Sequence, residues 1–185
     1  MPPGILVWRA NRRQQRKAAA YVSAVLAEPD PNDVSWLSIA ATKGDVDHAE
    51  WELRYARRAI GLIVAQRNAL DDRTEAFVAR CLADAFATDR HVAPDMLDTA
   101  ARQFNARLSA YRDGLAARGG PALSTRMGQT LLAFAGGSFT RDETNVIRAG
   151  ATLERYITEC AVALEQAFGR VSLPEQVPPS ALPRG

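Results

Sequence analysis

The sequence predicts an all-α fold, a single-domain bundle of about seven helices, four of them long and three short. Apolar residues recur at intervals of three and four along most of the chain, which is the spacing of one helical face. Capping residues, prolines and glycines divide this pattern into segments, and no strand-length run alternates between apolar and polar residues. The 185 residues, 47% of them hydrophobic, suit one core. We assign residues 1–169 to a helical domain and residues 170–185 to a proline-rich extended tail.

The first two helices are separated by a proline-rich break. The first covers about residues 5–27 and ends at Glu28-Pro29-Asp30-Pro31, because proline cannot continue a helix. Asp30 is the expected N-cap of a short second helix, with Pro31 at its first position. Gly44 follows the end of this helix, where a glycine is commonly found.

Acidic residues mark the starts of the third and fourth helices. The run Asp47-His48-Ala49-Glu50 is an acidic variant of the capping box and predicts a helix that extends to about residue 69. Asp71 or Asp72 is the expected N-cap of the fourth helix. That helix would bury apolar side chains such as Phe77 and Leu82 on one side.

The last three helices have equally clear boundaries. Pro94 begins the fifth, which reaches about residue 118 and ends at Gly119-Gly120-Pro121. Ser124 is the expected N-cap of a shorter sixth helix. A full capping box, Thr140-Arg141-Asp142-Glu143, opens the seventh, which ends at Gly169.

The fifth and seventh helices carry the most regular apolar pattern. Their apolar residues step alternately by four and three, which keeps one seam facing a neighbouring helix, either in a bundle or between subunits. Gly150 lies on the seam of the seventh helix, and we expect a second helix to approach its backbone closely there. The residues assigned to this helix-seam contact are Leu97, Phe104, Leu108, Tyr111, Leu115, Leu153, Ile157 and Leu164.

Composition excludes several classes of partner and location. The chain has 21 arginines, only two lysines and a formal net charge of +2, which predicts no general attraction to nucleic acid or membranes. Together with the abundant alanine, the arginine bias is typical of a high-GC, bacterial genome. No apolar run approaches the roughly 18 residues that span a bilayer. Cys81 and Cys160 fall on apolar helical stripes, which predicts buried, reduced thiols and a cytoplasmic location.

Five basic residues lie on one face of the first helix. Packing on one face and hydration of the other would explain their spacing, but a solvated face usually mixes positive and negative charges. Residues 1–27 contain no acid, whereas residues 28–53 contain seven acids and one base. We therefore interpret the basic face as an electrostatic partner-binding surface, attracted to the acidic segment of the same chain or of another copy. Its residues are Arg9, Arg12, Arg13, Arg16 and Lys17.

The sequence offers little chemistry for a reactive centre. Asp45, Asp47, His48 and Glu50 could together seat a divalent cation, although roles at a helix start account for the acids more simply. Phosphate-binding glycine loops and nucleophile elbows do not occur. We therefore name no catalytic residue, cofactor or metal ligand. Enzymatic activity stays open, with the sequence favouring a non-catalytic role.

These observations favour a non-catalytic helical protein-interaction or assembly module, an adaptor, scaffold or oligomer subunit that acts through contact surfaces. The expected partner is protein, either a second copy or another chain, in preference to nucleic acid. One alternative is an α-helical enzyme or a small-ligand or metal-binding protein with a site between Asp45 and Glu52. A second alternative is the binding of an anionic polymer by the basic face of the first helix. The helical features are generic and carry no resemblance to a known family.

Overall fold

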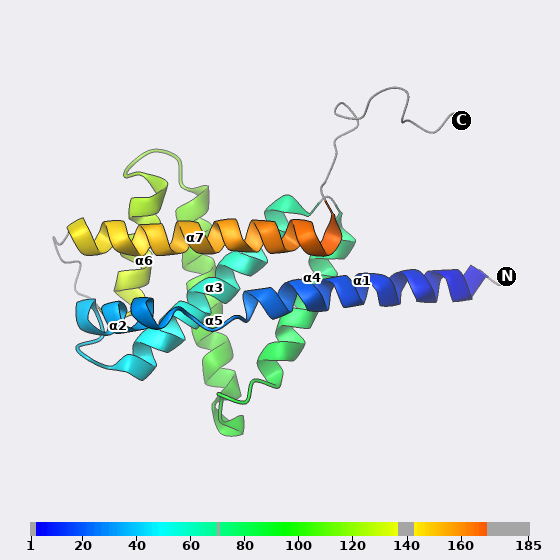
Figure 1. Cartoon of the computed structure of the whole chain (residues 1–185), viewed down its shortest axis with the longest axis horizontal. Helices are drawn as coiled ribbons and strands as arrows, with labels where there is room; N and C mark the ends of the chain where they lie inside the picture. Colours follow the sequence, from blue (N-terminus) through cyan, green and yellow to red (C-terminus); the bar gives the residue numbers. More distant parts are fainter. Residues whose placement is uncertain (1–2, 70, 137–142, 170–185) are drawn as a thin grey trace.

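The computed structural model describes residues 3–69, 71–136 and 143–169, without the side chains of residues 3–7 and 9. Over these residues the chain is all-α and contains no strand, as predicted (Figure 1). Four of the seven α-helices are long and three are short, and a 3₁₀ turn, η1, precedes the fifth. The predicted tail and most of the predicted capping box before the seventh helix lie outside the described residues. The elements are α1 (Pro3–Val25), α2 (Pro31–Ala40), α3 (Val46–Asn68), α4 (Asp72–Ala87), η1 (Pro94–Met96), α5 (Leu97–Ala116), α6 (Leu123–Phe134) and α7 (Glu143–Phe168).

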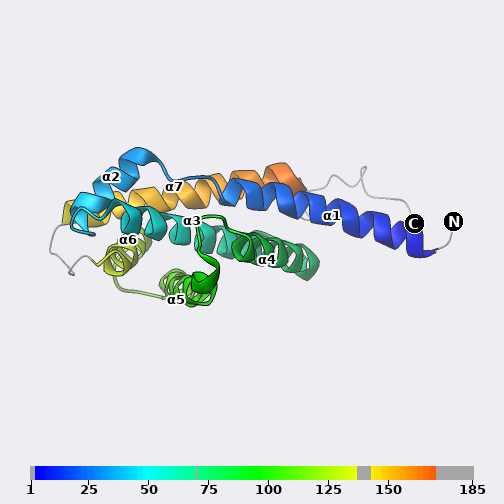
Figure 2. The same ribbon diagram turned by 90° about the horizontal axis from the view of Figure 1, so that it is seen from below.

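The helices form layers with α3 in the middle. Figure 2 shows α1, α2 and α7 on one side of the bundle and α5 on the other, with α3 between them. Helices α4 and α6 pack on α3 and also directly on α1 and α7, respectively. Helix α3 packs against all six other α-helices, while α6 makes its main contact with α7. Apolar side chains of α3 such as Leu53, Ile60 and Ile63 are buried. A helix surrounded on all sides must carry apolar residues around most of its circumference, and this is the character of α3.

The apolar seams of α5 and α7 pack against other helices of the same chain. Leu108, Tyr111, Leu153 and Leu164 are buried, while the other four predicted seam residues are partly buried. Both helices pack on α3 and α6, and α7 packs on α1 as well.

Two glycines allow α6 and α7 to pack backbone against backbone. A Cβ atom added to Gly150 would lie 2.6 Å from the carbonyl oxygen of Ser124, and one added to Gly128 would lie 2.3 Å from that of Val146. Neither position has room for a side chain. The expected close approach at Gly150 is confirmed, and α6 is the helix that makes it.

Two of the predicted helix starts differ from those in the structure. Asp30 is the N-cap of α2 as predicted, and Asp71 is the N-cap of α4. Asp45, rather than Asp47, begins α3, because its side chain accepts a hydrogen bond of 2.9 Å from the backbone N–H of His48. The prediction for α6 is wrong as well: the helix begins at Leu123, so Ser124 lies inside it and the cap position is an alanine.

Candidate functional site

The N-terminal part of α1 projects beyond the rest of the bundle. Both views show its first turns extending past the ends of α4 and α7 (Figures 1 and 2). Ala18, Tyr21, Val22 and Val25 anchor the other half of the helix in the core. Trp8 on the projecting part is 58% exposed, so this region offers a large aromatic surface to another molecule.

The sequence-predicted basic residues of α1 are divided between two environments. Arg12, Arg13 and Arg16 are exposed, and the guanidinium of Arg12 lies 5.1 Å from the centre of the Trp8 ring. Lys17 is partly buried, and its Nζ lies 3.4 Å from the carbonyl oxygen of Phe168 at the end of α7. A cation there is favoured by the α7 dipole. The Arg9 side chain is outside the described part of the chain.

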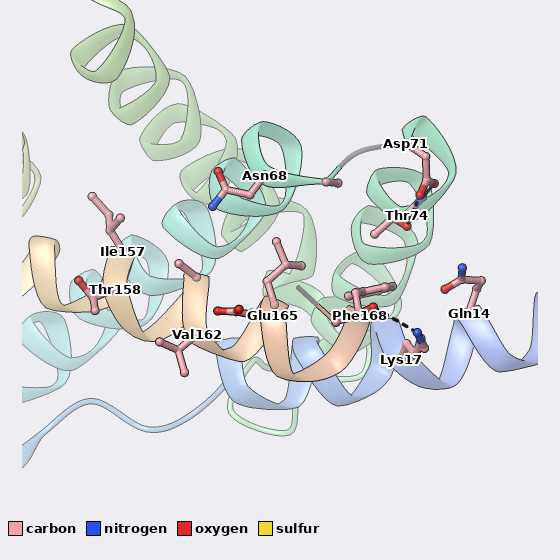
Figure 3. A pocket seen from close by; sticks show the side chains of 14 residues that line it. Gln14, Lys17, Asn68, Asp71, Thr74, Ile157, Thr158, Val162, Glu165 and Phe168 are labelled. Atoms are coloured by element: carbon pink, nitrogen blue, oxygen red, sulfur yellow. Dashed lines mark hydrogen bonds between the residues drawn. The ribbon is translucent and has the colours of Figure 1, made fainter. Parts of the chain in front are cut away.

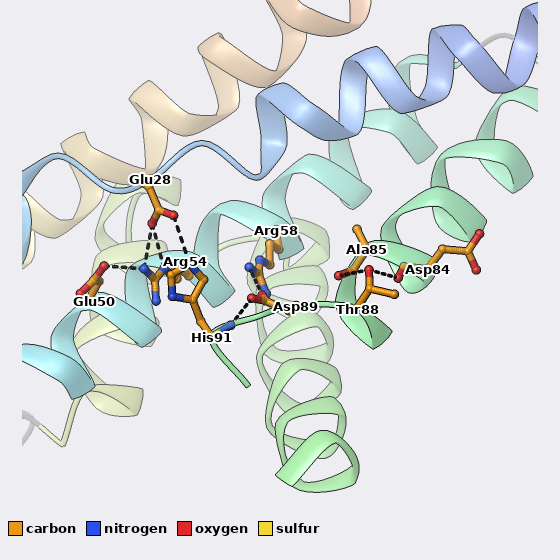
Figure 4. A network of polar contacts seen from close by, with 9 residues as sticks. All are labelled: Glu28, Glu50, Arg54, Arg58, Asp84, Ala85, Thr88, Asp89 and His91. Carbon is orange, nitrogen blue, oxygen red and sulfur yellow. Dashed lines mark hydrogen bonds and ion pairs between the residues drawn. The ribbon is translucent and has the colours of Figure 1, made fainter. Parts of the chain in front are cut away.

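The acidic segment that follows α1 is paired with arginines elsewhere in the chain. Arg54 of α3 donates hydrogen bonds to Glu28 at 2.9 and 3.0 Å and to Glu50 at 2.6 Å (Figure 4). Asp33 of α2 forms an ion pair with Arg155 of α7. These contacts tie the segment to α3 and α7.

Glu52 of the same segment is paired with Arg107 of α5, whose Nε donates to it at 2.8 Å. Among the described side chains, no ion pair joins a base of α1 to an acid of residues 28–53. The two blocks of opposite charge are therefore not brought together within one chain. The exposed arginines of α1 have no ion-pair partner among the described residues.

A second polar cluster fixes the connection between α4 and α5. The Arg58 side chain is 7% exposed, lies 5.4 Å from the centre of the Phe86 ring and donates a 2.6 Å hydrogen bond to Asp89. Burial raises the pKa of Asp89, but the backbone N–H of His91 and the Arg58 guanidinium lower it by more, so its pKa is below the ordinary value. Figure 4 shows the contacts of Asp89 with Arg58 and His91. The cluster therefore has a structural role, because it joins Arg58 of α3 to the connection between α4 and α5.

The residues between Asp45 and Glu52 do not converge on a common point. Asp45 is occupied as the α3 cap, and Asp47 is exposed in the first turn of the helix. His48 lies 3.3 Å from Glu52, which is already paired with Arg107. Within the described ranges, no group of three or more histidine, cysteine or acidic side chains is arranged to hold a metal ion.

Two of the hollows in the described part of the structure are lined mainly by apolar surface, and neither was predicted from the sequence. One, of about 760 Å³, lies between α1, the α3–α4 corner and the end of α7 (Figure 3). The other, of about 510 Å³, is an apolar groove between α4 and α5 over Leu62. Each is lined by segments far apart in the sequence, so no local motif marks them.

None of the described helices combines the length and apolarity needed to cross a membrane.

Comparisons of the chain with protein-family models, with curated proteins and with solved structures found no significant match.

Proposed function

We propose that this chain is a non-catalytic helical interaction module that binds an acidic surface of another protein through the projecting part of α1. The observation that carries the proposal is the charge arrangement of the chain. Four acids of residues 28–53 are paired with arginines of α3, α5 and α7. Arg12, Arg13 and Arg16 consequently keep a positive potential that an acidic partner would complement.

The side chains on this surface favour protein as the partner. Trp8 and Arg12 are in contact with each other and exposed. Tryptophan and arginine are the residue types most enriched at the energetically important positions of protein interfaces. A helix that stands clear of its own bundle can also lie in a groove of a partner, as amphipathic helices do in many complexes. Two thiols without a disulfide, Cys81 and Cys160, fit a reducing compartment, and we place this function in the cytoplasm.

Comparative affinity capture tests the proposal. The bait is the full chain, compared with a variant in which Arg12, Arg13 and Arg16 are replaced by glutamate. A control variant replaces three exposed arginines elsewhere by glutamate, which gives the same change in net charge; these are Arg90, Arg102 and Arg118. Bound proteins are quantified by mass spectrometry after nuclease treatment of the extract.

We expect at least one protein that the wild type and the control variant both retain and that the α1 variant loses. Retention of the same proteins by all three baits would contradict the proposal. So would an α1-dependent recovery that disappears entirely on nuclease treatment, since that result would assign the surface to nucleic acid.

A further inference from the structure

The hollow between α1 and α7 has a mainly apolar base with polar groups around it. Its volume is about 760 Å³. Ile157, Ala161 and Leu164 of α7 supply apolar surface, and Val162 beside them is 48% exposed. Polar side chains of α1, α3, α4 and α7 and the Asp71 cap surround it, among them Gln14, Lys17, Asn68, Thr74 and Glu165 (Figure 3). An occupant with apolar side chains and free backbone amides would match this lining.

One polar atom in the lining lacks a partner. The side-chain oxygen of Gln14 is buried and accepts no hydrogen bond within the described chain. A buried acceptor without a donor is destabilising, and such groups are normally satisfied in native proteins. A backbone N–H of an extended peptide in the hollow would be a suitable donor to Gln14.

The chain itself leads to this hollow. Gly169, the residue after α7, is part of the lining. It has φ +92°, and its N–H donates to the carbonyl oxygen of Glu165 at 2.8 Å. This left-handed residue ends the helix and turns the backbone away from the helix axis. The last described residue, Gly169, therefore lies at the wall of this hollow.

We propose that the segment 171–185, VSLPEQVPPSALPRG, occupies this hollow in its own chain. Its prolines exclude a helix and favour an extended, polyproline-type backbone. At about 3.1 Å per residue, fifteen such residues reach roughly 45 Å, so length does not limit the segment. Val171, Leu173 and Val177 supply apolar side chains for the α7 surface, and the non-proline residues supply N–H donors for Gln14.

The covalent link favours the chain's own tail over other occupants. A segment tethered at the wall of its site has an effective concentration in the millimolar range. The tail of a second copy would have to compete with it at the much lower concentration of free protein. The proposal therefore specifies a docking contact within one chain, which covers the apolar side of α7 next to the base of the projecting helix.

Limited proteolysis of the full chain tests this contact. Trypsin cleaves after Arg170, at the start of the segment, and after Arg184, so mass spectrometry follows the release of residues 171–184. Val162→Asp places a charge in the hollow without disturbing the core, since this side chain is half-exposed. Ile147→Asp is the matched control, because Ile147 is 63% exposed on the same helix and does not line the hollow. Circular dichroism verifies that both variants remain folded.

We expect V162D to release the segment at least about fivefold faster than the wild type, whereas I147D matches the wild type. Protection of the wild type should not change with protein concentration. Equal rates in all three chains would overturn the proposal, as would equal acceleration by both substitutions. Protection that increases with protein concentration would also overturn it, because the occupant would then be the tail of a second copy.

Discussion

Glu52 of α3 and Arg107 of α5 form an ion pair that joins the two helices. The Arg107 Nε lies 2.8 Å from a Glu52 carboxylate oxygen, and the Glu52 side chain is only 3% exposed. The guanidinium also lies 4.6 Å from the centre of the Phe134 ring. The pair thus links α3, α5 and the end of α6, and it satisfies a carboxylate that water does not reach.

Replacing Arg107 by methionine should strongly destabilise the fold. Methionine keeps an apolar stem but leaves the buried Glu52 carboxylate without its arginine, with only the partly exposed His48 beside it. Removing one partner of a buried ion pair costs about 3–5 kcal/mol. Urea unfolding measures the loss. The double variant E52L/R107M is the control, because it removes both charges and should recover most of the stability. A loss below about 1 kcal/mol in R107M, or no recovery in the double variant, would contradict a structural role for the pair.

Asp89 should make the stability of the chain depend on pH in acid. Because its pKa is lower in the folded chain than in the unfolded one, its carboxylate stabilises the fold above the unfolded pKa of about 3.9. This stabilisation is lost as the pH falls through the lower, folded pKa. We expect Asp89→Asn to lower the free energy of unfolding at pH 6 and to weaken its fall between pH 5 and pH 2.5. Urea titrations at these pH values measure both effects.

The control for this experiment is Asp113→Asn, since Asp113 is exposed on α5. Its pH dependence should follow that of the wild type. An Asp89→Asn variant with the acid sensitivity of the wild type would show that the Arg58–Asp89 pair does not contribute to it.

Substitution of Gly128 by alanine should separate α6 from α7. The added methyl group would lie 2.3 Å from the Val146 carbonyl oxygen, so one backbone must move. We expect a loss of at least about 2 kcal/mol, in the range of overpacked cores. Gly114→Ala is the matched control, because its Cβ would have only an ordinary 3.7 Å contact with Met127. That variant should gain up to about 1 kcal/mol from helix propensity. Thermal unfolding measures whether each substitution lowers or raises the stability of the fold. Equal changes in stability for the Gly128 and Gly114 variants would refute the packing explanation.

The helix boundaries could be predicted because they depend on local chemistry. Asp30 and Asp71 cap the helices that immediately follow them. The start of α3 was assigned to the wrong acid because two candidates lie two residues apart. Lys43 and Gly44 both have positive φ, and this turn leaves Asp45 in the extended conformation that a cap requires. A turn with two left-handed residues is not evident from Lys43 in the sequence.

The partners of the charged residues could not be predicted because they depend on how helices cross. Arg107 is 55 residues from Glu52, and Arg155 is 122 residues from Asp33. The charge blocks suggested attraction between α1 and the segment after it. Instead, α3, α5 and α7 supply the arginines that pair with that segment. The hollow beside Gln14 was missed for the same reason, since its lining comes from the two ends of the chain and the α3–α4 corner.

Site-specific photo-crosslinking from position 8 tests the proposed contact surface most directly. A photoreactive amino acid replaces Trp8 on the projecting helix in one full-length chain, and Ile39 of α2, which is 79% exposed, in the other. We predict a nuclease-resistant adduct with another protein from position 8 that is absent from position 39 and is lost when Arg12, Arg13 and Arg16 are reversed to glutamate. The absence of any protein adduct from position 8, or identical adducts from both positions, would contradict the account.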